Sequence, residues 1–361
     1  MSAPDLTAEQ RVAFDKAIAF LKAKRVERPF FVIDGVAGVG KSVLLAALAH
    51  AVPGAALAAP TGKAASVLSR KCGLTVSTVH SLIYLFRGEY IGDDGERRLS
   101  FAQKIQNGAW NRRAALIDEA SMVDGFLASD LLATGCRVIA TGDPGQLPPV
   151  RGTRFFDRSD AVLRTVHRQA LESPILRQAH AVRAGRHYAA DGDAFRVQQH
   201  VNREEILAAD VILCWRNATR HALNALVRAH KGLDGPPIAG ERVVCLRNDH
   251  KLGILNGACY DLIEDYDTLR RAAKLRNERG DIVFVEDCRF ETLDQPGDPA
   301  DARDEHPFGF GYALTCHKAQ GSEWSSIILV DEYDRQEWRG EWVYTAITRA
   351  SERMLVHSTW A

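Results

Sequence analysis

The first third of the chain alternates short apolar runs with longer stretches in which apolar residues recur at helical spacing. The apolar runs predict buried strands, and each is followed by a polar or glycine-rich stretch. Strands that alternate with helical segments form parallel βαβ units, which bind ligands at the carboxyl ends of their strands. The pattern therefore predicts an α/β sheet with a ligand-binding edge, whose strands lie at residues 29–34, 55–59, 114–117 and 137–141.

A second α/β region is predicted to start near residue 159, with helical patterns over 173–184 and 218–229 and a strand over 210–215. Short runs typical of antiparallel strands follow at 241–246, 258–263 and 281–288, and the α/β pattern resumes at Tyr312. These changes predict an α/β chain of two parallel-sheet domains, the second interrupted by a small β insertion. The predicted boundaries are 1–158 for the first domain, 159–233 with 307–361 for the second, and 234–306 for the insertion.

Composition excludes several classes of protein. Of the 361 residues, 46% are hydrophobic and 25% are charged, which argues against disorder. The formal net charge is zero, which argues against a histone-like binder but leaves a local basic groove open. No apolar run approaches the roughly 18 residues of a membrane span, and the first residues lack the basic-then-apolar order expected of a secretory signal. Seven scattered cysteines without a CxxC pair favour reduced thiols.

One glycine-rich turn carries a strong chemical signal. Residues 35–42, Gly-Val-Ala-Gly-Val-Gly-Lys-Ser, match G-x-x-x-x-G-K-[ST] in full, after a strand and before an apolar helical run. In such a loop, backbone N–H groups surround phosphates, Lys41 reaches the β- and γ-phosphates, and the Ser42 hydroxyl holds Mg²⁺. The sequence therefore predicts a nucleotide site formed by Val36, Ala37, Gly38, Val39, Gly40, Lys41, Ser42 and Val43.

Polar residues that follow the next strands complete this site. Asp118 at a strand end can hold Mg²⁺ through water, and Glu119 beside it can polarise the attacking water. After the following strand, Gln146 lies within Gly-Asp-Pro-Gly-Gln and can report the γ-phosphate, although that segment is also a good turn sequence. Together with the phosphate loop, these residues predict a hydrolytic ATP site that uses Mg²⁺.

At this point the chain resembles the superfamily 1 helicases, in particular the RecD-like and Dda-like branch. The resemblance covers nearly the whole chain, and the family motifs occur in order. They match residues 6–10 (Q motif), 35–42 (I), 59–65 (Ia), 77–82 (Ib), 117–122 (II), 142–148 (III), 163–169 (IV), 314–323 (V) and 344–350 (VI). The resemblance implies two RecA-like domains, a β-hairpin insertion at 84–104 in the first and an SH3-like module at 234–306 in the second.

The resemblance also implies roles for residues outside the phosphate loop. Arg168 and Arg349 would reach the γ-phosphate from the second domain as arginine fingers. Glu323 would bind the nucleotide through its ribose, or else is an exposed carboxylate in a turn. Gln10 would read adenine, but Thr7-x-x-Gln10 also fits a helix capping box.

A single-strand track is implied by the same motifs. Hydroxyls, backbone amides and lysines suit contacts to phosphates, which carry no sequence information. The residues implied to line the track are Pro60, Thr61, Lys63, His80, Thr315, His317 and Lys318. In the hairpin, Asp94-Gly95 is a turn signal, and Tyr90 or Phe101 would press on the duplex junction. The alternative is an exposed hairpin without a wedge role. The stretch 281–305, with nine acidic and two basic residues, is not expected to face DNA.

The expected function is an ATP-dependent DNA helicase that moves 5′ to 3′ on single-stranded DNA and separates duplex. Two alternatives share the ATP site: a translocase that does not unwind, and a RecD-type subunit of a helicase–nuclease complex. A non-catalytic binding module is a third. The expected partners are single-stranded DNA, single/double-strand junctions and replication or recombination proteins. The expected setting is a monomer, without a membrane, in the cytoplasm of a bacterial or phage-infected cell and associated with the nucleoid.

Overall fold

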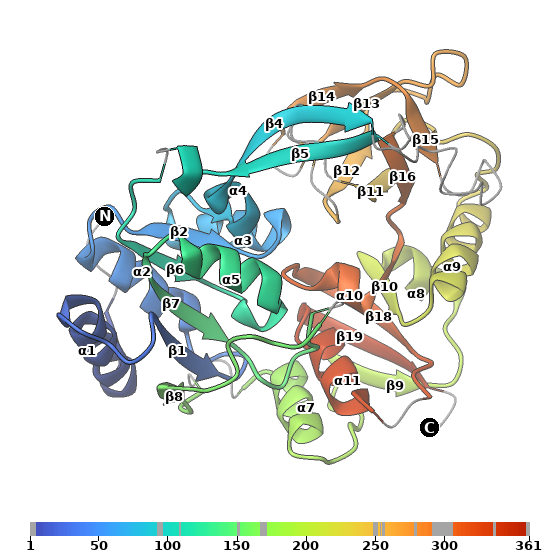
Figure 1. Ribbon diagram of the computed structural model, residues 1–361. Coiled ribbons are helices and arrows are strands. Elements are labelled where there is room, and N and C mark those ends of the chain that lie inside the picture. Colours follow the sequence, from blue (N-terminus) through green and yellow to red (C-terminus); the bar gives the residue numbers. More distant parts are fainter. Residues whose placement is uncertain are drawn as a thin grey trace.

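The computed structural model comprises three sheets and a two-stranded hairpin, with helices packed on two of the sheets (Figure 1). It describes residues 5–91, 97–107, 110–149, 152–166, 172–247, 252, 254, 257–277, 280–290, 306–334 and 337–358. Within these ranges no helix is long and apolar enough to cross a membrane. All seven cysteines are free thiols.

The first sheet is entirely parallel, as the sequence predicted, with strand order β3-β2-β6-β7-β1-β8. Its strands are β1 (Phe30–Gly35), β2 (Ala56–Ala59), β3 (Ser77–Thr78), β6 (Ala114–Ile117), β7 (Arg137–Gly142) and β8 (Ala161–Leu163). The associated helices are α1 (Ala8–Lys22), α2 (Lys41–Ala51), α3 (Gly62–Cys72), α4 (Val79–Ile83) and α5 (Gly125–Ala133), with short 3-10 turns at Ile105–Asn107 and Ala120–Met122. The four strands predicted from apolar runs are all present.

The predicted boundary after residue 158 is wrong. Strand β8 pairs in parallel with β1, opposite Ile33, Asp34 and Gly35, so the first sheet continues to Leu163. Leu163 is buried in the core that also holds Ile33 and Leu44. A three-residue strand carries too little periodicity to be found from the sequence. Strand β8 forms because it can pair with β1 at the open edge of the sheet.

The second sheet is also entirely parallel, in the order β17-β10-β18-β19-β9. Its strands are β9 (Phe195–Gln198), β10 (Val211–Cys214), β17 (Ala313–Thr315), β18 (Trp324–Asp331) and β19 (Ala350–Ser358). Its helices are α7 (Pro174–Arg183), α8 (Arg203–Ala208), α9 (Asn217–His230), α10 (Cys316–Ala319) and α11 (Arg339–Ile347). The two parallel sheets lie side by side, so that α10 and α11 face the first domain (Figure 1).

The third sheet forms the insertion, in the order β14-β13-β12-β11-β16-β15. Its strands are β11 (Arg242–Cys245), β12 (Cys259–Leu262), β13 (Ala273–Arg276), β14 (Ile282–Val285), β15 (Cys288–Phe290) and β16 (His306–Phe310). Because β16 pairs with β11, this sheet extends past the predicted end at residue 306. The predicted strand 281–288 is two strands, since Asp287 turns the backbone with a φ of 50°. Residues 291–305 of the acidic stretch lie outside the described residues.

The predicted hairpin is present as β4 (Tyr84–Ile91) paired antiparallel with β5 (Arg97–Gln103). It rises from the first domain toward β13 and β14 of the third sheet (Figure 1). Its turn at Asp94-Gly95 and the side chain of Tyr90 lie outside the described part of the structure. The Phe101 ring packs near the hairpin base, with its centroid 4.7 Å from that of His80.

Candidate active site and nucleic-acid track

The phosphate loop joins β1 to α2 at the carboxyl edge of the first sheet. Gly38 and Gly40 have φ values of 85° and 78°, which side chains adopt only with strain. A Cβ at Gly35 would lie 2.6 Å from Val39 Cγ2, so this position also needs glycine. Helix α2 is held in place by Leu44, Leu45 and Leu48 in the core. The loop therefore leads directly into the N-terminus of α2, and helix N-termini of this kind bind phosphates.

The Lys41 ammonium lies at the centre of this loop. It donates hydrogen bonds to the carbonyl oxygens of Gly35 at 2.7 Å and Val36 at 3.1 Å. Both acceptors belong to residues 35–42. The ammonium can therefore exchange these carbonyl oxygens for the oxygens of a bound phosphate without any rearrangement of the sheet. This is the geometry expected of a lysine that serves β- and γ-phosphates.

Asp118 and Ser42 meet where β6 ends beside α2. The Ser42 hydroxyl donates to Asp118 Oδ2 at 3.2 Å, while Asp118 Oδ1 accepts from the Thr141 hydroxyl at 2.7 Å. Mg²⁺ prefers hard oxygen ligands and is usually held by one or two carboxylates together with substrate phosphates. No cluster of three acidic, histidine or cysteine ligands occurs among the described residues, so Ser42 and Asp118 fit an Mg²⁺ ion that arrives with a nucleotide.

Glu119 occupies a strained and largely desolvated position. Its φ of 50° is left-handed, and within the described structure its Oε2 atom is buried with no hydrogen-bond partner. Burial raises the pKa of the Glu119 carboxyl, while the nearby Arg349 guanidinium acts in the opposite direction. A carboxylate with a raised pKa and a spare oxygen is suited to accept a proton from water.

Gln146 also presents an unused polar atom. The residue is buried, and its side-chain Oε1 has no partner among the described residues. Its backbone is fixed, because the Gln146 carbonyl accepts from Arg154 at 3.0 Å and its N–H donates to the Asp143 carbonyl at 3.1 Å. Buried polar groups are nearly always paired, so this carboxamide is available for a ligand.

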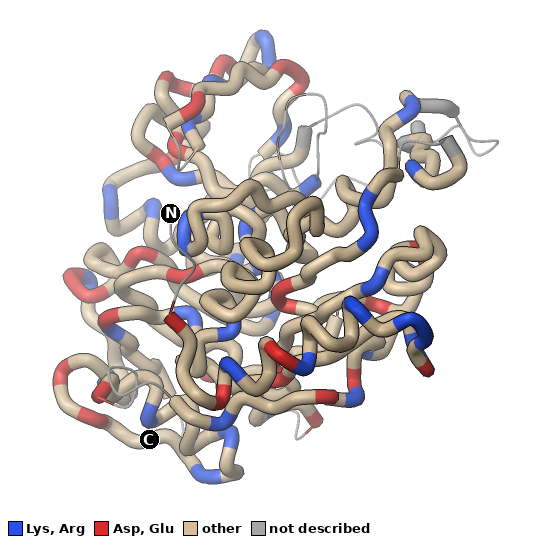
Figure 2. The backbone as a smooth tube through the Cα atoms, turned by 90° about the vertical axis from the view of Figure 1, so that its left-hand side faces the viewer, with Lys and Arg blue, Asp and Glu red and all other residues tan. Residues whose placement is uncertain are grey.

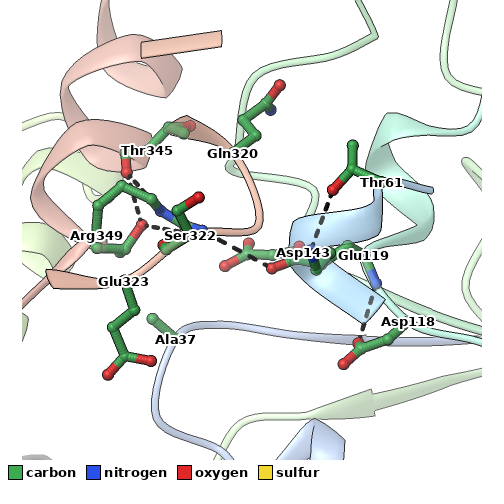
Figure 3. Close-up of polar contacts among 12 residues, drawn as sticks. Ala37, Thr61, Asp118, Glu119, Asp143, Gln320, Ser322, Glu323, Thr345 and Arg349 are labelled. Atoms are coloured by element: carbon green, nitrogen blue, oxygen red, sulfur yellow. Dashed lines mark hydrogen bonds and ion pairs between the residues drawn. The ribbon is translucent and has the colours of Figure 1, made fainter. Parts of the chain in front are cut away.

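Arg349 reaches the first domain from the end of α11. Its guanidinium is buried and is aimed by bonds from Nε to the Thr345 carbonyl at 3.1 Å and from an Nη to the Thr348 hydroxyl at 3.1 Å. Its Nη1 lies 3.9 Å from Glu119 Oε1, and Figure 3 shows the two side chains directed at each other across the domain boundary. The predicted second finger, Arg168, lies outside the described residues.

Gln10 forms the capping box that was the alternative to an adenine contact. Its Oε1 accepts from the Thr7 N–H at 2.9 Å, and the Thr7 hydroxyl accepts from the Gln10 N–H at 3.3 Å. The Gln10 Nε2 donates to the Val39 carbonyl of the phosphate loop at 3.0 Å. Both ends of the carboxamide are therefore engaged, and Gln10 ties α1 to the loop.

Replacing Gln10 with alanine is expected to lower the free energy of unfolding by about 1–2 kcal/mol, because a capping bond and a buried bond to Val39 are lost. Urea unfolding would measure the loss, and Thr7→Ala is the matched control that removes the other half of the capping box. Both variants should keep the wild-type preference between ATP and GTP. A loss of that preference in Gln10→Ala alone would instead establish the adenine contact.

Glu323 follows the motif V turn and forms an exposed ion pair across the domains. Its Oε2 lies 2.7 Å from the Lys71 ammonium, and both side chains are more than a third exposed. Such pairs contribute little to stability. Figure 3 places Glu323 near Ala37 of the phosphate loop.

The track residues lie where parallel strands end. Pro60 and Thr61 follow β2, His80 follows β3, and Thr315 ends β17 just before His317 and Lys318. The two halves of the track approach each other closely at Gly321. A Cβ there would lie 2.7 Å from Ala64 Cβ and 3.2 Å from the Thr61 hydroxyl. Motifs Ia and V from the two domains are therefore adjacent.

Three of these side chains are less exposed than expected of a simple phosphate contact. Lys63 is partly buried near Cys259 and Arg242 of the third sheet, and this burial lowers the pKa of its ammonium. Burial also lowers the pKa of His317, whose ring lies 5.2 Å from that of Trp215. The His80 ring packs against Tyr84 at 4.5 Å. Figure 2 shows Lys and Arg mixed with Asp and Glu on the face it views, in keeping with the zero net charge.

Sequence patterns did not identify a second set of residues at the domain boundary. Tyr344, Asp143 and Arg183 form a polar cluster beside Ala37, and the Leu147 N–H donates to the Thr345 hydroxyl at 2.9 Å. Gln320 Nε2 donates to the Leu147 carbonyl at 3.0 Å. Most of these residues belong to motifs III, V and VI, but motif membership does not say which side chains meet, and Arg183 lies outside every motif.

Two family models match the chain. One describes an AAA domain and matches residues 5–204, and the other describes a UvrD-like helicase C-terminal domain and matches residues 310–356. The first model alone covers more than half of the chain and includes the phosphate loop.

Curated relatives are similar over much of the sequence. The ATP-dependent RecD2 DNA helicase of Deinococcus radiodurans is 30% identical over 360 residues, which cover 89% of this chain and 46% of that protein. The ATP-dependent DNA helicase dda of Enterobacteria phage T4 is 34% identical over 158 residues, covering 42% of this chain and 34% of that protein. The aligned part is thus less than half the length of either relative.

Solved structures share the whole arrangement. A Bacteroides Pif1 bound to ssDNA superposes with a TM-score of 0.63 at 20% identity, over 98% of this chain and 92% of that chain. The Pif1 helicase from Candida albicans gives 0.58 at 18% identity, over 98% and 94%. At these identities the likeness concerns the fold.

Proposed function

The chain belongs to the superfamily 1 helicases of the RecD-like and Dda-like branch, and from this premise we propose that it is an ATP-dependent DNA helicase. It moves 5′ to 3′ on single-stranded DNA and separates the strands at a single/double-strand junction. The observation that carries the proposal is the meeting of Arg349 with Glu119 across two parallel-sheet domains, directly beside the phosphate loop. An ATP site divided between two domains can convert hydrolysis into relative motion of the domains.

Each part of the site has one task in this proposal. The loop amides and Lys41 bind the phosphates, and Ser42 and Asp118 hold Mg²⁺, which when bound neutralises phosphate charge. Glu119 accepts the proton of the attacking water. Arg349 stabilises the charge that develops on the γ-phosphate, and the free Oε1 of Gln146 accepts a hydrogen bond from the attacking water and orients it.

Alternating grip on the single strand provides directed movement. Residues of motif Ia belong to the first domain and those of motif V to the second, so closure and opening of the ATP site change the spacing of the two sets of phosphate contacts. In this proposal the hairpin of β4 and β5 meets the duplex, with Tyr90 or Phe101 as the contact to the junction. Aromatic side chains suit this role because they stack on any base.

The test is strand separation on two partial duplexes, one with a 5′ single-stranded tail and one with a 3′ tail, in ATP and Mg²⁺. Unwinding of only the 5′-tailed duplex is expected. Lys41→Ala is the control, because it removes the ammonium that binds the phosphates and should abolish unwinding without disturbing the sheet.

Other outcomes would each contradict a specific part of the proposal. Unwinding from the 3′ tail alone would mean the opposite polarity. Robust DNA-stimulated ATP hydrolysis without unwinding would favour a translocase or a RecD-type subunit. DNA binding without any hydrolysis would favour a non-catalytic module.

A further inference from the structure

A buried carboxylate lies between the two domains beside the phosphate loop. Asp143 follows β7 and is fully buried. Its Oδ2 accepts from the Tyr344 hydroxyl at 2.5 Å, and its Oδ1 accepts from the Gly145 N–H at 3.0 Å and from the Arg183 guanidinium. Tyr344 lies on α11 and Arg183 ends α7, so two of the three donors come from the second domain.

The same cluster reaches the phosphate loop. The Tyr344 hydroxyl accepts from the Ala37 N–H at 3.0 Å, and the Arg183 guanidinium lies 5.5 Å from the centre of the Tyr344 ring. Burial and the Asp143 charge raise the pKa of Tyr344, so the phenol stays protonated and remains a donor to Asp143. Four segments distant in sequence are thereby fixed relative to one another.

The charge on Asp143 makes this contact dependent on domain closure. A fully buried carboxylate is costly without a cation, and Arg183 is the cation paired with it. If the domains separate, Asp143 loses both Arg183 and Tyr344 and keeps the Gly145 N–H of its own segment. The closed arrangement is therefore the one in which this carboxylate is satisfied.

Closure at Asp143 also sets the position of Arg349. Tyr344 and Thr345 are consecutive on α11; the first is bound to Asp143, and the second accepts from the Leu147 N–H. The Thr345 carbonyl in turn accepts from Arg349 Nε at 3.1 Å. The helix segment that contacts the first domain is thus the segment that directs the arginine finger.

We propose that Asp143, Arg183 and Tyr344 form an interdomain clamp that positions Arg349 opposite Glu119. Arg183 and Tyr344 are positioning residues in this clamp. The proposal rests on the proposed ATP hydrolysis. It predicts that breaking the clamp slows the chemical step, whereas binding of ADP, whose phosphates lie in the first domain's loop, is retained.

The first test is Arg183→Ala, with steady-state ATP hydrolysis measured at saturating single-stranded DNA. We expect kcat to fall about 10- to 100-fold, since a hydrogen bond to a charged group is lost. The dissociation constant for ADP should stay within about 3-fold of wild type, well below the tenfold change that a lost charged bond would cause. Arg183→Lys, which keeps the charge, should recover part of kcat. Arg177→Ala is the matched control: it lies on the same helix but pairs with Asp191 of its own domain.

A steric variant tests the clamp without removing any polar group. A Cβ at Gly145 would overlap Arg183 Nη1 and lie 3.0 Å from Arg183 Cζ, both at the far end of a flexible side chain, and the Gly145 backbone is outside the left-handed region. Gly145→Ala should therefore fold normally, displace the guanidinium and lower kcat in the same direction as Arg183→Ala.

The outcomes separate this inference from the proposed function. No ATP hydrolysis by the wild type would refute the proposed function itself. If the wild type is active and Arg183→Ala behaves like Arg177→Ala, the clamp is refuted. A parallel loss of ADP binding in Arg183→Ala would also refute it, because the residue would then support the fold of the nucleotide site rather than the position of Arg349.

Discussion

Replacing Arg349 with alanine is expected to lower kcat for ATP hydrolysis by about three to five orders of magnitude, the range that arginine fingers contribute to phosphoryl transfer. The guanidinium is buried, is aimed by Thr345 and Thr348, and lies 3.9 Å from Glu119. A positive charge held in this way needs no reorganisation when charge develops on the γ-phosphate. Alanine removes that charge from a desolvated position, where its effect is greatest.

Single-turnover hydrolysis with radiolabelled ATP would measure the Arg349 effect. Arg353→Ala, an exposed arginine on the following strand, is the matched control and should hydrolyse ATP at the wild-type rate. ATP binding measured by equilibrium titration should persist in Arg349→Ala. A fall in kcat of less than about tenfold, or 1.4 kcal/mol, would show that this arginine is not the finger.

Replacing Glu119 with glutamine is expected to lower kcat by about two to four orders of magnitude, the usual contribution of a general base. Glutamine keeps the size of the side chain, and the neutral amide suits a buried position beside Asp118. The variant should therefore bind ATP and single-stranded DNA while it fails to turn over. Glu352→Gln, an exposed residue on β19, is the control expected to leave hydrolysis unchanged.

The pH dependence of hydrolysis gives Glu119 a second signature. Its carboxyl must be deprotonated to accept a proton, and burial raises its pKa above the usual value. The wild-type rate should therefore rise with pH through that raised pKa, and the residual rate of Glu119→Gln should lack this limb. In Arg349→Ala the limb should move to higher pH, because the cation that lowers the pKa is gone. An unchanged limb in Glu119→Gln would assign the titration to another group.

The candidate nucleotide site could be predicted from the sequence because its parts are local. The phosphate loop is one contiguous segment whose glycines determine its backbone, so Lys41 and Ser42 follow from spacing alone. Asp118 and Glu119 were found because a parallel strand places the residues that follow it at one edge of the sheet. The resemblance then added Arg349, which no local pattern could have brought to Glu119.

Other features were decided by contacts between segments distant in sequence. The three residues of strand β8 carry almost no periodicity. Strand β8 nevertheless joins the first sheet, because β1 offers it an unpaired edge. For Gln10, the sequence fitted two roles; the structure shows the capping box and a bond to the phosphate loop, and the adenine contact stays a prediction. Lys63 became partly buried because the third sheet covers it.

The sequence by itself indicated which backbone can hold a nucleotide and where the four apolar strands of the first sheet lie, since hydrogen bonding and periodicity act within short segments. Only the tertiary structure decided which side chains meet at the domain boundary. Asp143, Tyr344 and Arg183 come together there because a carboxylate withdrawn from water requires a donor and a cation, and both are supplied by the other domain.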